Sequence, residues 1–171
     1  MEVKQIEGFH GLPREYVAIS IEQQAIHQST KDYEWLGHGV YFFKYIDDAK
    51  WWVSHKRYKD RETAILQATL TYSSSQLLDL DDPKEQETIT KVFLEAIQRA
   101  DDSIKLSETA TTYQKWCFAC NLIRTMQPQI GIIIFTFPVE QKKENVLFPK
   151  NRCQICVSDE SIISNIREAT L

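Results

Sequence analysis

The sequence predicts a single domain of the α+β class. Its 171 residues suit one hydrophobic core, and 43% hydrophobic with 26% charged residues is an ordinary globular composition. Predicted strands and helices are mixed along the chain without a strand–helix–strand rhythm and without a glycine-rich phosphate loop. These absences disfavour a doubly wound parallel sheet. We therefore expect one α+β domain over residues 1–171.

The N-terminal segment is predicted to be a strand, a turn and a helix. The strand covers about 5–10 and the turn is Gly11-Leu12-Pro13, because glycine and proline favour turns. Pro13 also suits the first position of a helix, where its missing amide hydrogen has little cost. The helix is expected to end near 23–24, with Ile19 on its apolar side.

The middle of the chain is predicted to continue with strands around one helix. Residues 40–43 are a dense run of strand formers. An acidic residue at 47–48 can cap the amphipathic helix that follows. Alternating apolar residues then predict a strand at 63–72, and a short strand is expected at 77–80.

The C-terminal half is predicted to hold three helices and two strands. The helices have apolar residues at helical spacing, and the strands are short apolar runs. In order, these elements are helices at 84–100 and 111–126, strands at 132–137 and 154–157, and a short closing helix at 161–168.

Charge and termini exclude several classes of protein. The formal net charge is −4, so the chain has no overall field for nucleic acid, and small basic groups at 56–61 and 142–152 are predicted to be solvated faces. The longest apolar stretch, 130–135, is too short to cross a bilayer. The charged segment 1–7 is unlike a signal peptide, which predicts a reducing, cytoplasmic location and no membrane partner.

The cysteines form two pairs with Cys-x-x-Cys spacing, Cys117 with Cys120 and Cys153 with Cys156. Two such pairs are able to hold one zinc ion. However, the second pair lies on a predicted strand, where residues three apart point to opposite faces. Neither pair has a glycine knuckle beside it. The pattern favours buried thiols over a zinc site, and no metal is predicted.

Two short motifs carry the functional signal. The first, Gly8-Phe9-His10-Gly11, places a histidine at the end of a strand with a glycine after it. The second, Trp35-Leu36-Gly37-His38-Gly39-Val40-Tyr41-Phe42, is a glycine-flanked entry into an aromatic strand. In these motifs and their order the chain resembles the ADP-ribosyltransferase superfamily. The resemblance is to the branch that includes the poly(ADP-ribose) polymerase catalytic core, diphtheria-type toxins and small bacterial relatives.

The resemblance implies a split, mixed β-sheet core with flanking helices and an enzyme that uses NAD⁺ as co-substrate. His10 is then expected to hydrogen-bond ribose hydroxyls, and the backbone of Gly11 to hold the nicotinamide amide. Tyr41 is expected to lie along the nicotinamide ring, where an aromatic face gives contact area and orientation. The other NAD⁺-binding residues that the resemblance implies are Trp35, Gly39, Phe42 and Tyr45.

The third motif departs from the family, which most often has a glutamate on a late strand. Gln154 occupies that position, and it is expected as the third catalytic residue with His10 and Tyr41. An amide hydrogen-bonds a ribose hydroxyl but provides neither negative charge nor a general base, so a single ADP-ribose transfer is expected rather than a polymer. Three loop glutamates are alternative carboxylates, and their spacing does not choose among them: Glu34, Glu144 and Glu160.

The predicted function is therefore NAD-dependent mono-ADP-ribosyl transfer to a protein or nucleic acid, without a metal. Small enzymes of this type resemble bacterial toxins, toxin–antitoxin systems and phage-defence effectors, so an antitoxin or regulatory partner is also expected. The alternatives are a binding module for NAD⁺ or ADP-ribose that has lost turnover, an NAD⁺ hydrolase, and an RNA 2′-phosphotransferase. The last needs several arginines around a phosphate, for which Arg14, Arg57 and Arg61 are the nearby candidates.

Overall fold

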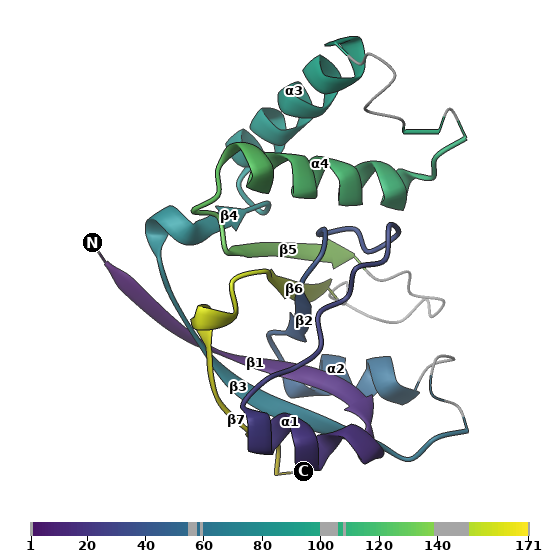
Figure 1. The fold of residues 1–171 in the computed structure, drawn as a ribbon, viewed down its shortest axis with the longest axis vertical. Helices are drawn as coiled ribbons and strands as arrows, with labels where there is room; N and C mark the ends of the chain where they lie inside the picture. Colours follow the sequence, from purple (N-terminus) through teal and green to yellow (C-terminus); the bar gives the residue numbers. More distant parts are fainter. Residues whose placement is uncertain are drawn as a thin grey trace, which may run out of the picture.

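The computed structural model describes residues 2–54, 58, 60–99, 106–107, 109–138 and 151–170. Within these residues the fold is α+β, with seven strands in one mixed sheet and four α-helices (Figure 1). The strand order is β4-β5-β6-β2-β1-β3-β7. Strands β4 and β5 are parallel, and the other neighbours are antiparallel.

Strands and helices are mixed along the chain without a repeating strand–helix–strand unit, as the sequence predicts. The strands are β1 (Val3–Pro13), β2 (Val40–Phe43), β3 (Thr63–Ser73), β4 (Leu77–Asp79), β5 (Ile132–Pro138), β6 (Asn151–Val157) and β7 (Ile163–Glu168). The helices are α1 (Val17–Gln23), α2 (Ile46–Ser54), α3 (Pro83–Arg99) and α4 (Thr112–Met126). None of these helices is long and apolar enough to cross a membrane.

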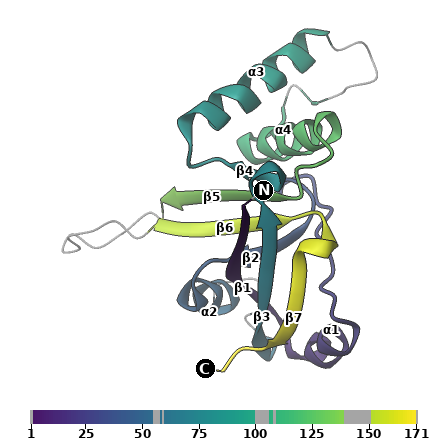
Figure 2. The same cartoon turned by 90° about the vertical axis from the view of Figure 1, so that its left-hand side faces the viewer.

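The sheet is nearly divided between β1 and β2. Strand β1 pairs with β3 from Val3 to Pro13, and β2 pairs with β6 over all its residues. In contrast, β1 and β2 share only the pair Phe9 and Phe43, so the two strands part immediately after it. Figure 2 shows the result: β5 and β6 run crosswise to β3 and β7.

The helices cover different parts of this divided sheet. Helix α2 packs against β1 and β3, and α1 packs against β7; Figure 2 shows them on opposite sides of this half. Helix α4 covers β5 and β6 through Cys120 and Ile123, which pack with Ile133. Helix α3 packs on α4, where the rings of Phe93 and Phe118 lie 6.2 Å apart.

Two local predictions are wrong, and both errors involve strand β3. Gly11-Leu12-Pro13 is the end of β1 rather than a turn, because β3 continues to pair with it as far as Pro13. The predicted helix at 161–168 is a 3₁₀ turn, Glu160–Ile162, followed by strand β7. Strand β7 pairs with the other edge of β3. Pairing with a distant strand therefore overrides local propensity in both segments.

All four cysteines are buried thiols, as predicted. Cys117 and Cys120 lie on α4, and Cys153 and Cys156 lie on β6. Burial raises the pKa of Cys117 to about 11 and that of Cys120 to about 12. Both side chains therefore hold their protons at neutral pH in this structure, and a protonated thiol is a weak nucleophile.

Candidate functional site

A cavity of about 930 Å³ opens where β1 and β2 part. Its walls come from the end of β1, from α1, from the segment 25–34, and from β2 and β6. This volume is at the upper end of the range for small-molecule sites. The cavity brings together five residues that the sequence singled out: His10, Gly11, Gly39, Tyr41 and Gln154.

His10 bridges the gap between the two parted strands. Its Nδ1 lies 2.7 Å from the backbone carbonyl oxygen of Tyr41. Because a carbonyl only accepts, the ring must carry its hydrogen on Nδ1 and donate it. Burial lowers the pKa of the ring, although the hydrogen bond to Tyr41 acts in the opposite direction, so the ring is neutral at pH 7. Nε2 is then an acceptor, suited to a ligand hydroxyl.

The neutral state of His10 predicts a loss of stability in mild acid. Its folded pKa lies below the unfolded value of about 6.5, so the unfolded chain binds this proton first as the pH falls. The contribution is therefore fully present above about pH 6.5 and declines below it, by at most about 1.4 kcal/mol per pH unit. Urea denaturation at several pH values is expected to show a shallower decline for His10→Gln than for the parent. Parallel pH profiles for the two proteins would contradict this assignment.

Tyr41 is held rigidly by the turn that precedes its own strand. Its hydroxyl donates to the carbonyl of Gly37 at 2.7 Å and accepts from the amide of Leu36 at 3.0 Å. Burial raises the pKa of this hydroxyl, and the charges of Cys156 and Glu34 raise it further, so it does not ionise. Tyr41 therefore acts as a fixed aromatic wall rather than as an acid or base.

Gly11 is needed at its position for a reason that the motif does not reveal. A Cβ built on it would overlap Cγ1 of Val53, because α2 crosses β1 at this point. The sequence-based interpretation explains this glycine by the approach of a planar ligand amide to the main chain. The structure adds a second reason, which is the close packing of α2 on β1.

Gln154 faces the cavity from β6 and is only 7% exposed. The indole Nε1 of Trp35 donates to its Oε1 at 2.5 Å. Since indole nitrogen is only a donor, the amide oxygen of Gln154 is identified and engaged. The side chain therefore offers its NH₂ group to a ligand. Trp35 itself is not among the lining residues but positions one of them.

Two further residues predicted for the pocket wall, Phe42 and Tyr45, also lie outside the cavity lining. Phe42 is fully buried in the main core, because it alternates with Tyr41 and points to the opposite face of the strand. Tyr45 follows the end of β2, is 58% exposed and contacts Lys44. Neither lines the cavity, whose aromatic lining is instead formed by Tyr16, Tyr41, Phe43, Trp52 and Tyr58.

Two of the three alternative carboxylates line the cavity. Glu34 lies in the segment before β2, and Glu160 lies in the 3₁₀ turn before β7. Glu144 lies outside the described residues.

Helix α4 supplies two residues that the sequence analysis did not single out. The side-chain oxygen Oδ1 of Asn121 accepts from the backbone amide of His38 at 2.8 Å. Arg124 donates to the carbonyls of His38, at 2.7 Å, and Cys156, at 3.1 Å. Together they fasten the glycine turn at 37–39 to β6. In the sequence, these two residues differ from other polar residues of the helix only in following the buried residues Cys120 and Ile123.

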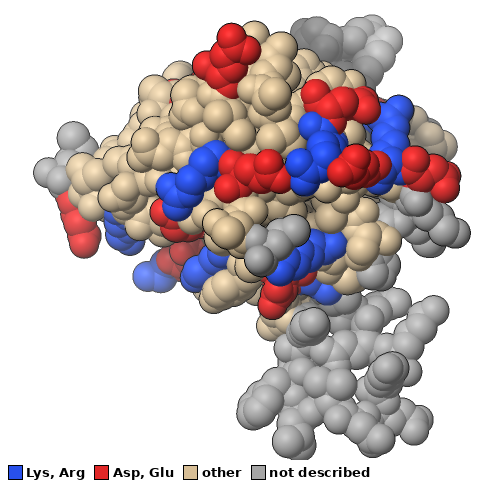
Figure 3. All heavy atoms as spheres, turned by 90° about the horizontal axis from the view of Figure 1, so that it is seen from below, with Lys and Arg blue, Asp and Glu red and all other residues tan. Residues whose placement is uncertain are grey.

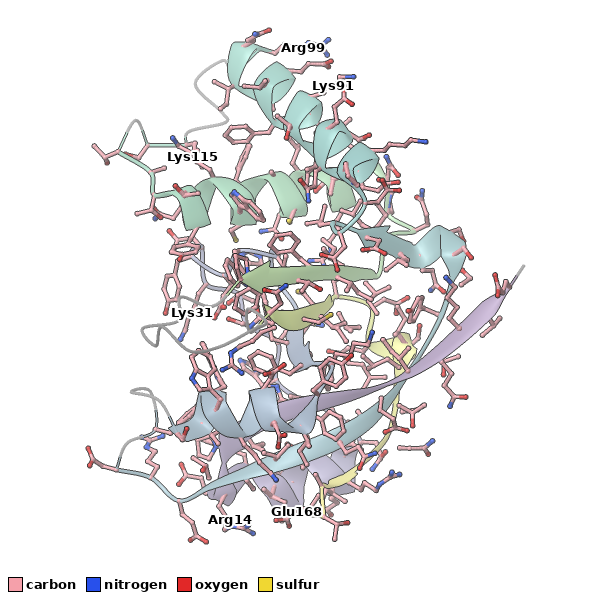
Figure 4. The ribbon with its side chains drawn as sticks, turned by 180° about the vertical axis from the view of Figure 1, so that it is seen from behind. Arg14, Lys31, Lys91, Arg99, Lys115 and Glu168 are labelled. Carbon is pink, nitrogen blue, oxygen red and sulfur yellow. The ribbon has the colours of Figure 1, made fainter. Side chains whose placement is uncertain are left out.

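Two of the three arginines proposed for phosphate binding, Arg14 and Arg61, are paired with acids. Arg14 contacts Glu168 at 2.8 Å and Glu62 at 3.0 Å, and Figure 4 shows Arg14 beside Glu168. Arg61 lies 3.8 Å from Glu15. Figure 3, a view from below Figure 1, shows acidic and basic side chains interspersed on this face. In the described residues Arg14 and Arg61 do not line the cavity, and Arg57 lies outside them.

The basic group at 142–152 is not a solvated face at its described end. Arg152 is 3% exposed and forms an ion pair with Asp48 of α2. Its guanidinium carbon lies 3.8 Å from the ring centre of Trp51. Residues 142–150, and 56, 57 and 59 of the other basic group, lie outside the described part.

Comparisons with protein-family models, with curated proteins and with solved structures found no match. The residues that line the cavity therefore carry the functional interpretation.

Proposed function

We propose that this protein is an NAD⁺-dependent mono-ADP-ribosyltransferase. The observation that supports this most is the meeting of His10, Gly11, Tyr41 and Gln154 around one cavity. These residues come from two motifs and a late strand that are far apart in the sequence. The parting of β1 and β2 beside His10 is also what a split ADP-ribosyltransferase-like sheet requires.

Each residue offers a group that suits one part of the nicotinamide ribose. Nε2 of the neutral His10 ring accepts a ribose hydroxyl, and the NH₂ group of Gln154 donates to a ribose oxygen. The fixed ring of Tyr41 provides a flat surface for nicotinamide. These contacts hold the reacting bond in one orientation, which lowers the entropic part of the barrier.

The reaction follows from this arrangement. The bond between C1′ of the ribose and the nicotinamide nitrogen breaks, and nicotinamide leaves as a neutral molecule with the bonding electron pair. A nucleophile of the acceptor forms the new bond to C1′ and loses its proton. The acceptor is a protein or a nucleic acid, and a regulatory or antitoxin partner that restrains the enzyme belongs to the same proposal.

The charges of the described residues that line the cavity favour this reaction over RNA 2′-phosphate transfer. Among its described lining residues, Lys31 is the only lysine or arginine. One lysine suits the pyrophosphate of NAD⁺, whereas gripping an additional RNA phosphate calls for arginine pairs. Arg14 and Arg61 are instead engaged by carboxylates on another part of the surface.

Nicotinamide release from labelled NAD⁺ tests the proposal. The parent protein is expected to release nicotinamide in the presence of a mixture of cellular protein and nucleic acid. His10→Ala and Tyr41→Ala are each expected to lower the rate by about 100-fold, because each removes a group preorganised for the reacting ribose and nicotinamide. His38→Ala is the matched control, since this histidine belongs to the same motif but does not line the cavity.

Two results would overturn the proposal. One is NAD⁺ binding without any nicotinamide release by the parent, which would instead identify a binding module. The other is a His10→Ala protein as active as the His38→Ala control. Release that needs no macromolecular acceptor would identify an NAD⁺ hydrolase.

A further inference from the structure

We propose that Glu34 supplies the catalytic carboxylate of this site, taking the role that Gln154 is unable to perform. This inference rests on the proposed transferase function and names a residue outside the third motif. The sequence offers three candidate glutamates and no means of choosing among them. The structure distinguishes two of them, Glu34 and Glu160, by exposure, by support and by what lies beside each, and Glu144 lies outside the described residues.

Glu34 is held in place by a rigid part of the cavity wall. The hydroxyl of Ser29 donates to its Oε1 at 3.0 Å. Ser29 is itself fixed to Gly39 by two backbone hydrogen bonds, of 2.8 and 3.0 Å. The carbonyl of Glu34 accepts from the amide of Gly37 at 2.9 Å, which closes the turn. A carboxylate supported from both its backbone and its side chain keeps its position without a ligand.

The surroundings of Glu34 are those of the predicted reaction centre. The side chain is half-buried and lines the cavity with Tyr41 and Gln154. Trp35, which follows Glu34 in the chain, donates a hydrogen bond to the side chain of Gln154. The Glu34 carboxylate is therefore connected to the Gln154 amide through its neighbour Trp35. The Glu34 charge also lies near enough to the Tyr41 hydroxyl to add to the effects of burial and of Cys156 in raising the pKa of that hydroxyl.

Glu160 is less suited to the same role. It also lines the cavity, but it is exposed, at the start of the 3₁₀ turn before β7. Its Oε1 accepts from the side chain of Gln28 at 3.0 Å. A carboxylate in contact with solvent interacts weakly with a charge that develops deeper in the pocket.

The roles proposed for Gln154 and Glu34 give a reaction in which atoms and charges balance. Gln154 orients the ribose through its NH₂ group, and Glu34 faces the positive charge that develops at C1′ while nicotinamide leaves with the bonding pair. As the acceptor nucleophile forms its bond to C1′, its proton passes to the Glu34 carboxylate and then to water. NAD⁺ and the protonated acceptor thus give the ADP-ribosylated acceptor, nicotinamide and one proton.

Glu34→Gln tests this inference because it removes the charge and keeps the shape. We expect its kcat for nicotinamide release to fall by about 100-fold or more, with the Kd for NAD⁺ from calorimetry within about threefold of the parent. Asp32→Asn is the matched control: it makes the same carboxylate-to-amide change in the same segment, outside the cavity lining, and it keeps the oxygen that accepts from Gln114. Its kcat is expected to equal that of the parent.

A second variant separates chemistry from folding. In Glu34→Ala, added formate is expected to restore nicotinamide release in proportion to its concentration, which a merely structural role would not allow. Glu34→Gln with at least half the parent kcat, or a loss confined to Glu160→Gln, would overturn the inference and leave the proposed function standing. A parent that binds NAD⁺ and releases no nicotinamide would overturn both.

Discussion

Replacing Gly39 with alanine is expected to lower the free energy of unfolding by about 3–5 kcal/mol, a large effect for one methyl group. The backbone of Gly39 has φ of +155°, which residues with a side chain rarely adopt. An added Cβ would also lie 2.6 Å from the carbonyl oxygen of Val157 and 2.8 Å from Sγ of Cys156. Two backbone hydrogen bonds to Ser29 prevent the residue from moving away.

Thermal and urea unfolding measure this effect. A loss of 3–5 kcal/mol corresponds to a midpoint about 10 °C lower for a chain of this size. Gly8→Ala is the matched control, because the atoms nearest to the same methyl group there belong to the side chains of Leu70 and Phe42, at 3.0 Å, rather than to the backbone. Its destabilisation is expected to be clearly smaller. Equal stabilities for the Gly39 and Gly8 variants would contradict the backbone argument.

Much of the candidate site was predictable because its residues carry local constraints. Gly39 is a glycine for backbone reasons, and a glycine before a run of strand formers is visible in the sequence. His10 and Tyr41 belong to such short segments, so their order along the chain is informative. The structure places them on the two sides of one gap.

The errors concern residues whose state depends on a distant partner. The residues at 163–168 do not by themselves distinguish a helix from a strand, because the segment becomes a strand by pairing with the edge of β3. Phe42 and Tyr41 are both aromatic strand residues, and only the layer that covers each face shows which one meets the core. The choice between Glu34 and Glu160 likewise depends on how exposed each residue is in the folded chain.

Arg152 is the clearest case of a residue misjudged from sequence. It belongs to a run of basic residues that is typical of a solvated face, yet it is 3% exposed. Its partner, Asp48, lies 104 positions away along the chain, on α2. A buried arginine requires a carboxylate and an aromatic surface, and here Asp48 and Trp51 provide them.

Asp48→Ala is therefore expected to destabilise the fold by about 3–5 kcal/mol, because it leaves the Arg152 guanidinium buried without its counter-ion. Asp48→Ala combined with Arg152→Met is expected to recover most of the loss, since apolar side chains of similar size tolerate burial. Urea denaturation of the single and double variants measures both effects. A double variant as unstable as Asp48→Ala would show that the ion pair is not the cause.

The same pair of variants tests whether α2 sets the width of the cavity. Helix α2 contacts both sides of the parted sheet: Val53 packs on Gly11 of β1, and Asp48 holds Arg152 of β6. Gln154 lies two residues beyond Arg152 and so faces the same side of β6. If the ion pair fixes the distance from β1 to Gln154, the stable double variant will show the proposed nicotinamide release at a rate several-fold lower than that of the parent. If it is only a folding contact, the recovery of stability will restore the rate as well.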